Sequence, residues 1–516
     1  MKTTLLFFFV SCATAFAQNQ NLSNTSNFNG EPYLAINPTN PQNIVVAWMH
    51  VNLINRPIRT RTTFDGGITW QPYVDLPIAN TNTADPTMAF DNNGNLHLCF
   101  IDHLGSSSPT NNGGVYSYTS YDGGLSWGNQ SVVIDINADG AHQPIDRPWL
   151  VCDRSGGLND GNLYLTTKVV AGTPAPYHPY FVQSTDGGTS WSNWAYVDTT
   201  GWLSSIGSTF AAPTVTSDGV FAAVYPSYET SQSPIPKYLM AYINNNTSNT
   251  FDYKTSINNL PTVSNDSAKR GWQFVSNPFD SDHLSFFYTN GPDGDLDIYM
   301  TETYDFGDNW TTPLRVNDDP IGNGILQDMI WASFDTDGDL VVCWRDRRNS
   351  GGQGYAQPSE IFGRIRWHDS TDFSPSFIVT DTIADYNNVL SQSGNDFMCH
   401  QLLNDTLYIS WADTKTGFLN IWFDKIAMTS GNSVGLTNLA GSELPIVKVY
   451  PNPSNEWVNL EIDELHLESI VVLDMDGRVV IRPEALKFSV SDLPTGSYVI
   501  RILTSETTII RKLVVN

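Results

Sequence analysis

The chain has 516 residues, of which 15% are charged and 12% are aromatic, and it contains 38 glycines. Few charges with many aromatic residues and glycines are typical of a β-rich fold with many turns, and they disfavour a coiled coil, a helical bundle or a disordered chain. The formal net charge of −27 disfavours nucleic acid and anionic membrane surfaces as partners.

The first residues have the pattern of an export signal. Lys2 precedes an apolar run that begins at Leu5, and Ala15-Phe16-Ala17 supplies small residues before a cleavage position. No later apolar stretch reaches the roughly 18–20 residues that a membrane-spanning helix needs. We therefore expect a signal peptide over residues 1–17, an exported mature chain and no membrane span.

A repeated motif organises most of the remaining chain. The pattern S/T-x-D-x-G-x-S/T/N-W occurs four times, at Thr63–Trp70, Ser120–Trp127, Ser184–Trp191 and Thr303–Trp310. The motif aspartates are 57, 64 and 119 residues apart, so we expect a degenerate copy near Asp252, and a weaker copy lies at Ser370–Phe377. Each copy predicts a tight turn, because the aspartate accepts hydrogen bonds from nearby amides and glycine supplies a positive φ. The motif resembles the Asp box, or BNR repeat, of sialidase-type β-propellers.

The sequence around the motifs supports the same unit. Strand-like runs recur in each period, as at Tyr33–Asn37 and Asn43–Trp48 before the first motif. Counting these recurrences gives seven units between residues 25 and 430, whereas the resemblance to sialidases also allows six. We predict an all-β chain with a β-propeller over residues 18–430.

The composition changes after the propeller. A linker is expected over residues 431–444, followed by short alternating strands over residues 445–516 that predict a small β-sandwich. Pro451-Asn452-Pro453, the Asp474-to-Arg478 turn and the Leu493-to-Tyr498 strand resemble the C-terminal sorting domain of the type IX secretion system. That resemblance implies the secretion machinery as a partner and a secreted or cell-surface location. An Ig-like accessory module is the alternative.

Propeller geometry places the strand-1 starts and strand-2 ends on the face opposite the motif turns, and the sialidase resemblance places the active site there. The charged, histidine and tyrosine residues at these positions are Glu31, Asp85, Asp146, Arg147, Arg270, Asp328, Asp396, His50, Asp102, His103, Lys168, Tyr225, Tyr288, Arg345, Asp346, Arg347 and Asp413.

A ring of this kind offers paired carboxylates for glycoside hydrolysis and arginine forks for an acidic sugar. The predicted catalytic residues are Asp146 or Asp328 as the acid and Tyr225 as a nucleophile. The predicted substrate-binding residues are Arg147, Arg270, Arg345 and Arg347. The alternative for each residue is a structural cap or ion pair at a strand end.

The resemblance to sialidases is incomplete, because the first unit opens with Gly30-Glu31-Pro32 and no Arg-Ile-Pro segment occurs anywhere. The leading hypothesis is a sialidase-like glycoside hydrolase that acts on an acidic glycan. The alternatives are a polysaccharide lyase on the same fold and a non-catalytic glycan-binding or adhesion propeller.

The sequence leaves the cysteine and metal chemistry open. Cys99, Cys152, Cys343 and Cys399 are read either as buried thiols or as two disulfides, Cys99–Cys152 and Cys343–Cys399. The acidic segment Asp335–Asp339 predicts a β-turn, with a structural calcium ion as the alternative. We expect no other cofactor.

Overall fold

The computed structural model describes residues 19–515, except for 53–55, 78–81, 104–113, 136–144, 170–178, 199–210, 228–236, 244–249, 258–270, 388–394, 429–446, 463–466, 474–478, 484 and 505–507. The predicted signal peptide, the linker and Arg270 therefore lie outside the described residues. Backbone contacts divide the chain into two units, Met1–Gly435 and Leu436–Asn516.

The described residues of the first unit form seven antiparallel sheets of four strands each, which we call blades 1 to 7. Blade 1 contains β2 (Phe28–Ile36), β3 (Ile44–Val51), β4 (Ile58–Thr63) and β5 (Val74–Asp75). Blade 2 contains β6 (Asn82–Phe90), β7 (Leu96–His103), β8 (Gly114–Ser120) and β9 (Gly128–Asp135). Blade 3 contains β10 (Ile145–Cys152), β11 (Leu163–Val169), β12 (Tyr180–Ser184) and β13 (Ala195–Tyr196).

Blades 4 to 6 repeat the same order along the chain. Blade 4 contains β14 (Ala212–Val215), β15 (Phe221–Ser227), β16 (Lys237–Tyr242) and β17 (Asp252–Ile257). Blade 5 contains β18 (Trp272–Asn277), β19 (Asp280–Asn290), β20 (Asp297–Thr303) and β21 (Leu314–Arg315). Blade 6 contains β22 (Gln327–Phe334), β23 (Leu340–Asp346), β24 (Glu360–Arg366) and β25 (Phe377–Ile378).

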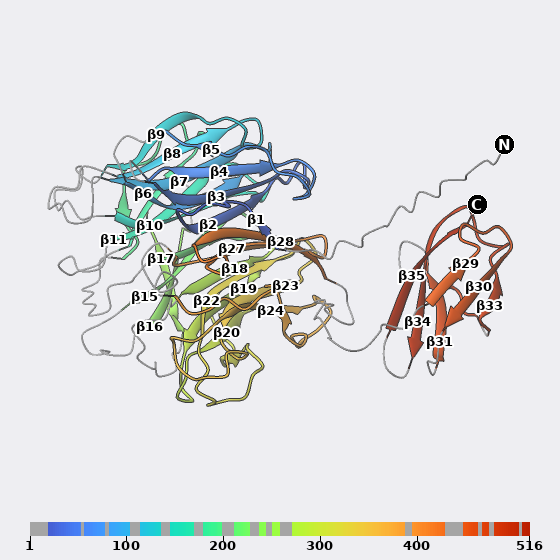
Figure 1. The fold of residues 1–516 in the computed structure, drawn as a ribbon. Coiled ribbons are helices and arrows are strands. Elements are labelled where there is room, and N and C mark those ends of the chain that lie inside the picture. Colours follow the sequence, from blue (N-terminus) through green and yellow to red (C-terminus); the bar gives the residue numbers. More distant parts are fainter. Residues whose placement is uncertain are drawn as a thin grey trace. The chain divides into compact units, whose positions relative to one another are not determined.

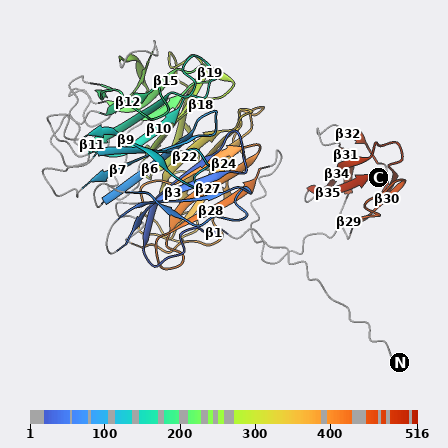
Figure 2. The same ribbon diagram turned by 90° about the horizontal axis from the view of Figure 1, so that it is seen from above.

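Blade 7 closes the ring, because its outer strand comes from the start of the chain. The strands β26 (Cys399–Leu403), β27 (Thr406–Asp413) and β28 (Asn420–Ala427) pair with β1 (Gln20–Asn21), which lies beside β28 (Figure 1). Blue blade 1 and orange blade 7 meet in the view from above (Figure 2), and β2 contacts β27 directly. This closure confirms the predicted β-propeller with seven blades rather than six, and it satisfies edge strands that would otherwise stay open.

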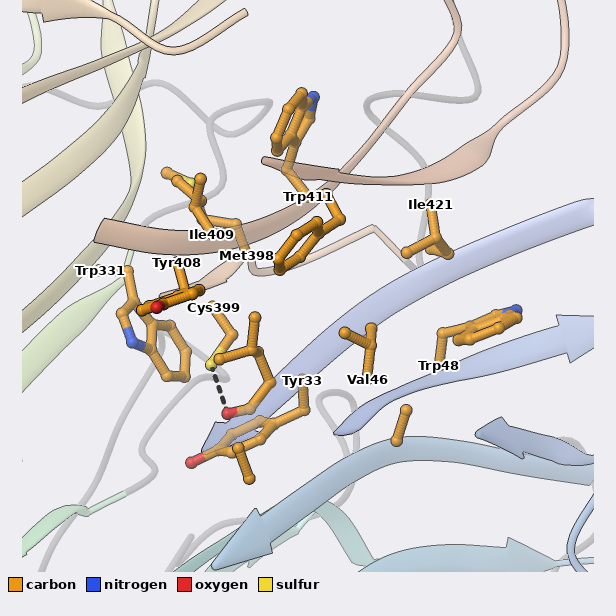
Figure 3. Close-up of a cluster of buried hydrophobic side chains, with 14 of the residues drawn as sticks. Tyr33, Val46, Trp48, Trp331, Met398, Cys399, Tyr408, Ile409, Trp411 and Ile421 are labelled. Carbon is orange, nitrogen blue, oxygen red and sulfur yellow. Dashed lines mark hydrogen bonds between the residues drawn. The ribbon is translucent and has the colours of Figure 1, made fainter. Parts of the chain in front are cut away.

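The largest apolar cluster joins the first and last blades. Figure 3 shows Trp48 of blade 1 and Trp411 of blade 7, both completely buried, in the same cluster as Tyr33 and Trp331. Tyr33 and Trp331 meet edge to face, with ring centroids 5.5 Å apart. Burial of aromatic side chains from both ends of the chain therefore stabilises the closed ring. The four cysteines of the described chain are free thiols on β7, β10, β23 and β26, so neither disulfide of the alternative reading is formed.

The four motif copies form the expected turns between the third and fourth strands of blades 1, 2, 3 and 5, and we call them repeat turns. In blade 2, Ser126 donates its amide hydrogen to Asp122 Oδ1 at 2.9 Å, and the Ser120 hydroxyl donates to the same oxygen at 2.8 Å. Gly124, with φ of 93°, lies so close to blade 1 that a Cβ there would stand 2.8 Å from Val45 Cγ2. Each repeat turn is thereby fastened to the blade before it.

The second unit is a small two-sheet β-structure. Its three-stranded sheet has β29 (Val447–Tyr450), β30 (Trp457–Ile462) and β33 (Lys487–Ser489). Its four-stranded sheet has β32 (Val479–Ile481), β31 (Leu467–Leu473), β34 (Gly496–Thr504) and β35 (Thr508–Val515). Both sheets contribute to one apolar cluster, which includes Val458, Phe488 and Ile500. This arrangement confirms the predicted β-sandwich.

Candidate active site

Three neighbouring blades begin with the same irregular backbone. Glu31, Asp85 and Arg147 have φ of 57°, 52° and 49°, at β-bulges in β2, β6 and β10. Each of them precedes a proline. A left-handed backbone at a residue other than glycine costs on the order of 1–3 kcal/mol, and such positions gather at functional sites. Bulges also redirect side chains: the Glu31 and Asp85 carboxylates contact the next blade, and the Arg147 side chain reaches Asp396.

The bulges connect the blades in series through carboxylates. Asp85 donates its backbone N–H to Glu31 Oε2 at 3.1 Å, and Arg147 donates its backbone N–H to Asp85 Oδ2 at 2.9 Å. The carboxyl group of Asp85 is also hydrogen-bonded to the carboxyl groups of Glu31 and Asp146. Glu31, Asp85 and Asp146 therefore form a continuous series, which we call the carboxyl line.

Two cations hold the end of the carboxyl line that is nearest to solvent. Lys168 Nζ lies 2.7 Å from Asp146 Oδ2, and Arg147 Nη2 donates to Asp396 Oδ2 at 2.6 Å. The side chains of Asp146 and Asp396 are 27% and 17% exposed, whereas Glu31 and Asp85 are buried. Asp146 and Asp396 are thus the carboxylates of this cluster that a ligand reaches first.

The carboxyl groups of the line have pKa values that are shifted in opposite directions by their surroundings. Burial, together with the charges of Asp396 and Asp146, raises the pKa of Glu31 to about 7 despite its hydrogen bonds to Asp85. Burial and the neighbouring carboxylates raise the pKa of Asp85 well above its usual value. Burial also acts to raise the pKa of Asp146, but the Lys168 ammonium, the hydrogen bond to Asp85 and the Arg147 guanidinium together outweigh it, and the net shift is downward. One line therefore holds a carboxyl group with a raised pKa beside one with a lowered pKa, the separation that acid–base catalysis uses.

The other predicted acid, Asp328, lies at the equivalent position of blade 6. Arg345 grips it with two hydrogen bonds, from Nε to Oδ1 at 2.7 Å and from Nη2 to Oδ2 at 2.6 Å. Arg347 adds a contact to Oδ1 at 3.2 Å and also donates to the carbonyl oxygens of Leu326 and Tyr355. All three charged side chains are buried, so this group is organised as an ion-pair network.

Tyr225 lies apart from the carboxyl line, in an apolar cluster with Phe181 and Phe221. Its hydroxyl donates to Asp198 Oδ2 at 3.0 Å, and burial raises its pKa, which works against a nucleophilic role. Arg270 lies outside the described residues. The catalytic roles of Asp146, Asp328 and Tyr225, and the binding roles of the arginines, stay predictions.

Several other ring candidates support strand ends. Asp346 accepts a hydrogen bond from Trp344 Nε1 at 2.7 Å, and Asp413 accepts one from Trp411 Nε1 at 2.8 Å. His50 Nδ1 lies 2.7 Å from Asn29 Oδ1. Tyr288 is packed in an apolar cluster, Asp102 is buried, and the side chain of His103 lies outside the described residues.

Glu31 and Asp85 belong to the predicted ring, but no role was predicted for either of them. A signal for them was present, because Glu31-Pro32, Asp85-Pro86 and Arg147-Pro148 open three successive units with a charged residue before proline. Proline cannot donate a backbone hydrogen bond, so its recurrence at one strand position indicates an interrupted ladder. A charged residue directly before each of these prolines was the sequence signal that could have identified the site.

The acidic segment of blade 6 forms the predicted β-turn, in which Gly338 donates its N–H to the carbonyl oxygen of Asp335 at 3.1 Å. Two groups of side chains around this turn are close enough to share a cation, Asp337–Asp339–His368 and Asp335–Asp337–Asp405. In each group, a backbone N–H of the protein already uses one carboxylate oxygen. The His368 N–H donates to Asp339 at 2.6 Å, and the Asp405 N–H donates to Asp335 at 2.9 Å. Oxygen donors of this kind suit calcium.

Comparison with known proteins assigns the C-terminal unit. Residues 448–516 match the family described as "Secretion system C-terminal sorting domain". The C-terminal unit is a secretion sorting domain. This confirms the type IX sorting domain that the sequence predicts, and it supports a secreted or cell-surface protein. Among the described residues, none belongs to a helix with the length and apolarity that crossing a bilayer requires.

About two thirds or more of the chain resembles solved structures at low identity, and no curated protein matches it. A protein of unknown function from Dyadobacter fermentans is 14% identical, with a TM-score of 0.43, over 79% of this chain and 98% of that one. A mutant of the NanB sialidase from Streptococcus pneumoniae is 12% identical, with a TM-score of 0.40, over 80% and 70%. An α-L-arabinanase from Penicillium chrysogenum, complexed with arabinobiose, is 13% identical, with a TM-score of 0.41, over 66% and 93%.

Proposed function

We propose that the protein is a secreted glycoside hydrolase whose reaction centre is the carboxyl line with Arg147 and Asp396. The supporting observation is the opposite shift of two hydrogen-bonded carboxyl groups, because the pKa of Asp85 is raised while that of Asp146 is lowered. Glycoside hydrolysis needs one carboxyl group that holds a proton and one that is ionised.

The exposed end of the line assigns the roles. Asp146 meets the substrate and gives the leaving-group oxygen the proton that it takes from Asp85 across their hydrogen bond. Asp396, which pairs with the Arg147 guanidinium at 2.6 Å, acts at the anomeric carbon, either directly or by deprotonating a water molecule. When Asp396 takes a proton from the attacking water molecule, Glu31, with a pKa of about 7, passes that proton back to Asp85, which restores both groups. When Asp396 attacks directly, Asp146 takes the proton from the water molecule that follows and returns it to Asp85.

The charge of the cluster favours a neutral glycan over an acidic one. Of the four arginines predicted to bind a sugar carboxylate, the three described ones are engaged by carboxylates of the protein, Arg147 by Asp396 and both Arg345 and Arg347 by Asp328. A carboxylated sugar at the carboxyl line would also meet its negative charge. We therefore propose a neutral glycan as the substrate, in place of the acidic glycan that the sequence suggested.

The test is hydrolysis by the full chain without residues 1–17. Arabinan, xylan, galactan and mannan are assayed beside sialyl-lactose and polysialic acid, by reducing-end release and by ultraviolet absorbance of unsaturated sugars. We expect reducing ends from at least one neutral polysaccharide without unsaturated products. Unsaturated products would indicate the lyase, and release from sialosides alone would overturn the neutral substrate. Binding without turnover would indicate the glycan-binding propeller.

A further inference from the structure

A pocket lies between blades 5 and 6, on the face of the propeller that carries the repeat turns. The carboxyl line lies on the opposite face. The pocket has a volume of about 530 Å³ and is lined by side chains that include Phe279, Glu302 and Tyr304 of blade 5 and Arg366, Trp367 and His368 after β24 of blade 6. Pockets of this size accept small organic ligands.

The pocket opens where blade 6 lacks a glycine-bearing repeat turn. In blades 1, 2 and 5 the second glycine position of the turn lies tightly against the preceding blade, with Phe423, Val45 and Met240 as the respective contacts, and in blade 3 it meets Leu163 of its own blade and His97 of blade 2 at ordinary distances. Blade 6 has the weak copy at Ser370–Phe377, without these glycines or the final tryptophan. Ser370 and Thr371 of that copy line the pocket between blades 5 and 6.

The Arg366–Glu302 wall of the pocket is fixed and close to neutral, and Asp337 lines the pocket beside it. Arg366 holds Glu302 with two hydrogen bonds, from Nη1 to Oε2 at 2.6 Å and from Nη2 to Oε1 at 2.5 Å. His283 Nε2 and the Ser285 hydroxyl also contact Glu302 Oε1, at 2.9 Å and 2.7 Å. Because the guanidinium is already paired, this wall offers hydrogen-bonding groups rather than a site for an anion.

The other walls are aromatic and open to solvent. Tyr304 is 57% exposed while its ring stacks on His283, with centroids 4.4 Å apart and an interplanar angle of 20°. Phe279 is 71% exposed at the β18–β19 turn, and Trp367 is partly buried. The stacking on His283 fixes one ring face, so the tyrosine is a preorganised platform. Aromatic faces beside fixed hydrogen-bonding groups suit the apolar C–H faces and hydroxyl groups of a sugar ring.

We propose that this pocket is a non-catalytic binding site for a neutral oligosaccharide. It would hold a polymeric glycan on the face opposite the carboxyl line and keep the enzyme on its substrate. Binding at this pocket does not require the carboxyl line, whereas the role of keeping the enzyme on its substrate rests on the proposed hydrolase function.

Affinity electrophoresis of the full chain without residues 1–17, in gels that contain arabinan, xylan, galactan or mannan, tests the site. The double variant Tyr304→Ala with Phe279→Ala removes both exposed rings. Tyr121→Ala is the matched control, because Tyr121 is a 63% exposed tyrosine at the corresponding place in the blade 2 repeat turn. Thermal unfolding of each variant verifies folding.

We expect retardation by at least one neutral polysaccharide and about tenfold weaker binding for the double variant, the size expected for losing aromatic contacts. Tyr121→Ala and Asp146→Asn retain the retardation, so a failure of catalysis is distinguished from a failure of this site. No retardation in any neutral gel, retardation by polysialic acid alone, or equal retardation of the double variant and Tyr121→Ala would overturn the proposal.

Discussion

Blades 3 and 6 place the same pair of charges at the same register position and use it differently. Asp146 pairs with Lys168 across β10 and β11, and Asp328 pairs with Arg345 across β22 and β23. Both aspartates immediately precede a bulge residue with positive φ. In blade 3 that residue is Arg147, whose guanidinium reaches Asp396, whereas in blade 6 it is Met329, which joins the apolar core.

The difference shows that accessibility, not the ion pair itself, separates a reactive carboxylate from a structural one. The Asp146 side chain is 27% exposed and has one lysine beside it, while that of Asp328 is completely buried between two arginines. A bidentate arginine grip with a second arginine leaves a carboxylate no freedom to exchange a proton. The ion pair with Lys168 leaves Asp146 able to share a proton with Asp85.

The sharpest way to break this comparison is to remove the negative charge in blade 3. Asp146→Asn should lower the hydrolytic rate by about 10²–10⁴-fold, since it removes proton transfer. Its free energy of unfolding should fall by about 1–3 kcal/mol, less than for a fully buried pair, because Asp146 is 27% exposed although Lys168 is buried. Asp160→Asn, at an exposed turn, is the control for rate and denaturant unfolding. A rate equal to that of the control would contradict the assignment.

The same change in blade 6 should act on stability. Asp328→Asn leaves two buried arginines without their shared counter-charge and should lower the free energy of unfolding by about 3–5 kcal/mol. Denaturant unfolding measures this directly. The comparison would fail if Asp328→Asn were as stable as Asp146→Asn.

Glu31 gives a pH-dependent version of the test. Because its folded-state pKa is raised to about 7 from an unfolded value near 4.5, the folded state binds more protons between these values. Its contribution to stability is therefore present below pH 4.5 and is lost as pH rises toward 7, by up to about 1.4 kcal/mol per unit. Glu31→Gln should remove this slope. An unchanged slope from pH 4.5 to 7 in unfolding experiments would show that Glu31 titrates normally.

The smallest effect is expected from exchanging the two cation types. Arg345→Lys loses the fork that holds both oxygens of Asp328 and should cost about 1–2 kcal/mol of unfolding free energy. Lys168→Arg keeps one charge beside a partly exposed carboxylate and should stay within about 0.5 kcal/mol. Equal costs for the two exchanges would remove the distinction between a bidentate and a simple ion pair.

The sequence predicted the architecture because its information is periodic. Four motif copies specify turns through residues such as Asp122 and Gly124, and the sorting domain has its own local pattern. A turn of this kind depends only on residues that are adjacent in the sequence, so the sequence predicts it directly. Blade number was harder, because closure depends on β1 pairing with β28 across almost the whole propeller.

The site was predicted only as a ring of candidates. Equivalent strand positions identified Asp146, Arg147 and Asp396 together with Asp328 and Arg345, but alignment of blades does not show which carboxylate is enclosed by arginines. That depends on side-chain burial and on contacts such as Arg147 with Asp396, whose partners are 249 residues apart. The recurring charged residue before proline marked the bulges at Glu31 and Asp85, but their left-handed backbone and its effect on the side chains depend on the folded chain.

The most direct test of the carboxyl line is a parallel measurement of kcat/KM on the neutral polysaccharide that the wild type cleaves, for Asp146→Asn and Asp160→Asn, both verified as folded by thermal unfolding. We predict that Asp160→Asn keeps the wild-type value and Asp146→Asn falls by at least about 100-fold. Equal values for the two variants would contradict the proposal that Asp146 carries the proton of the reaction.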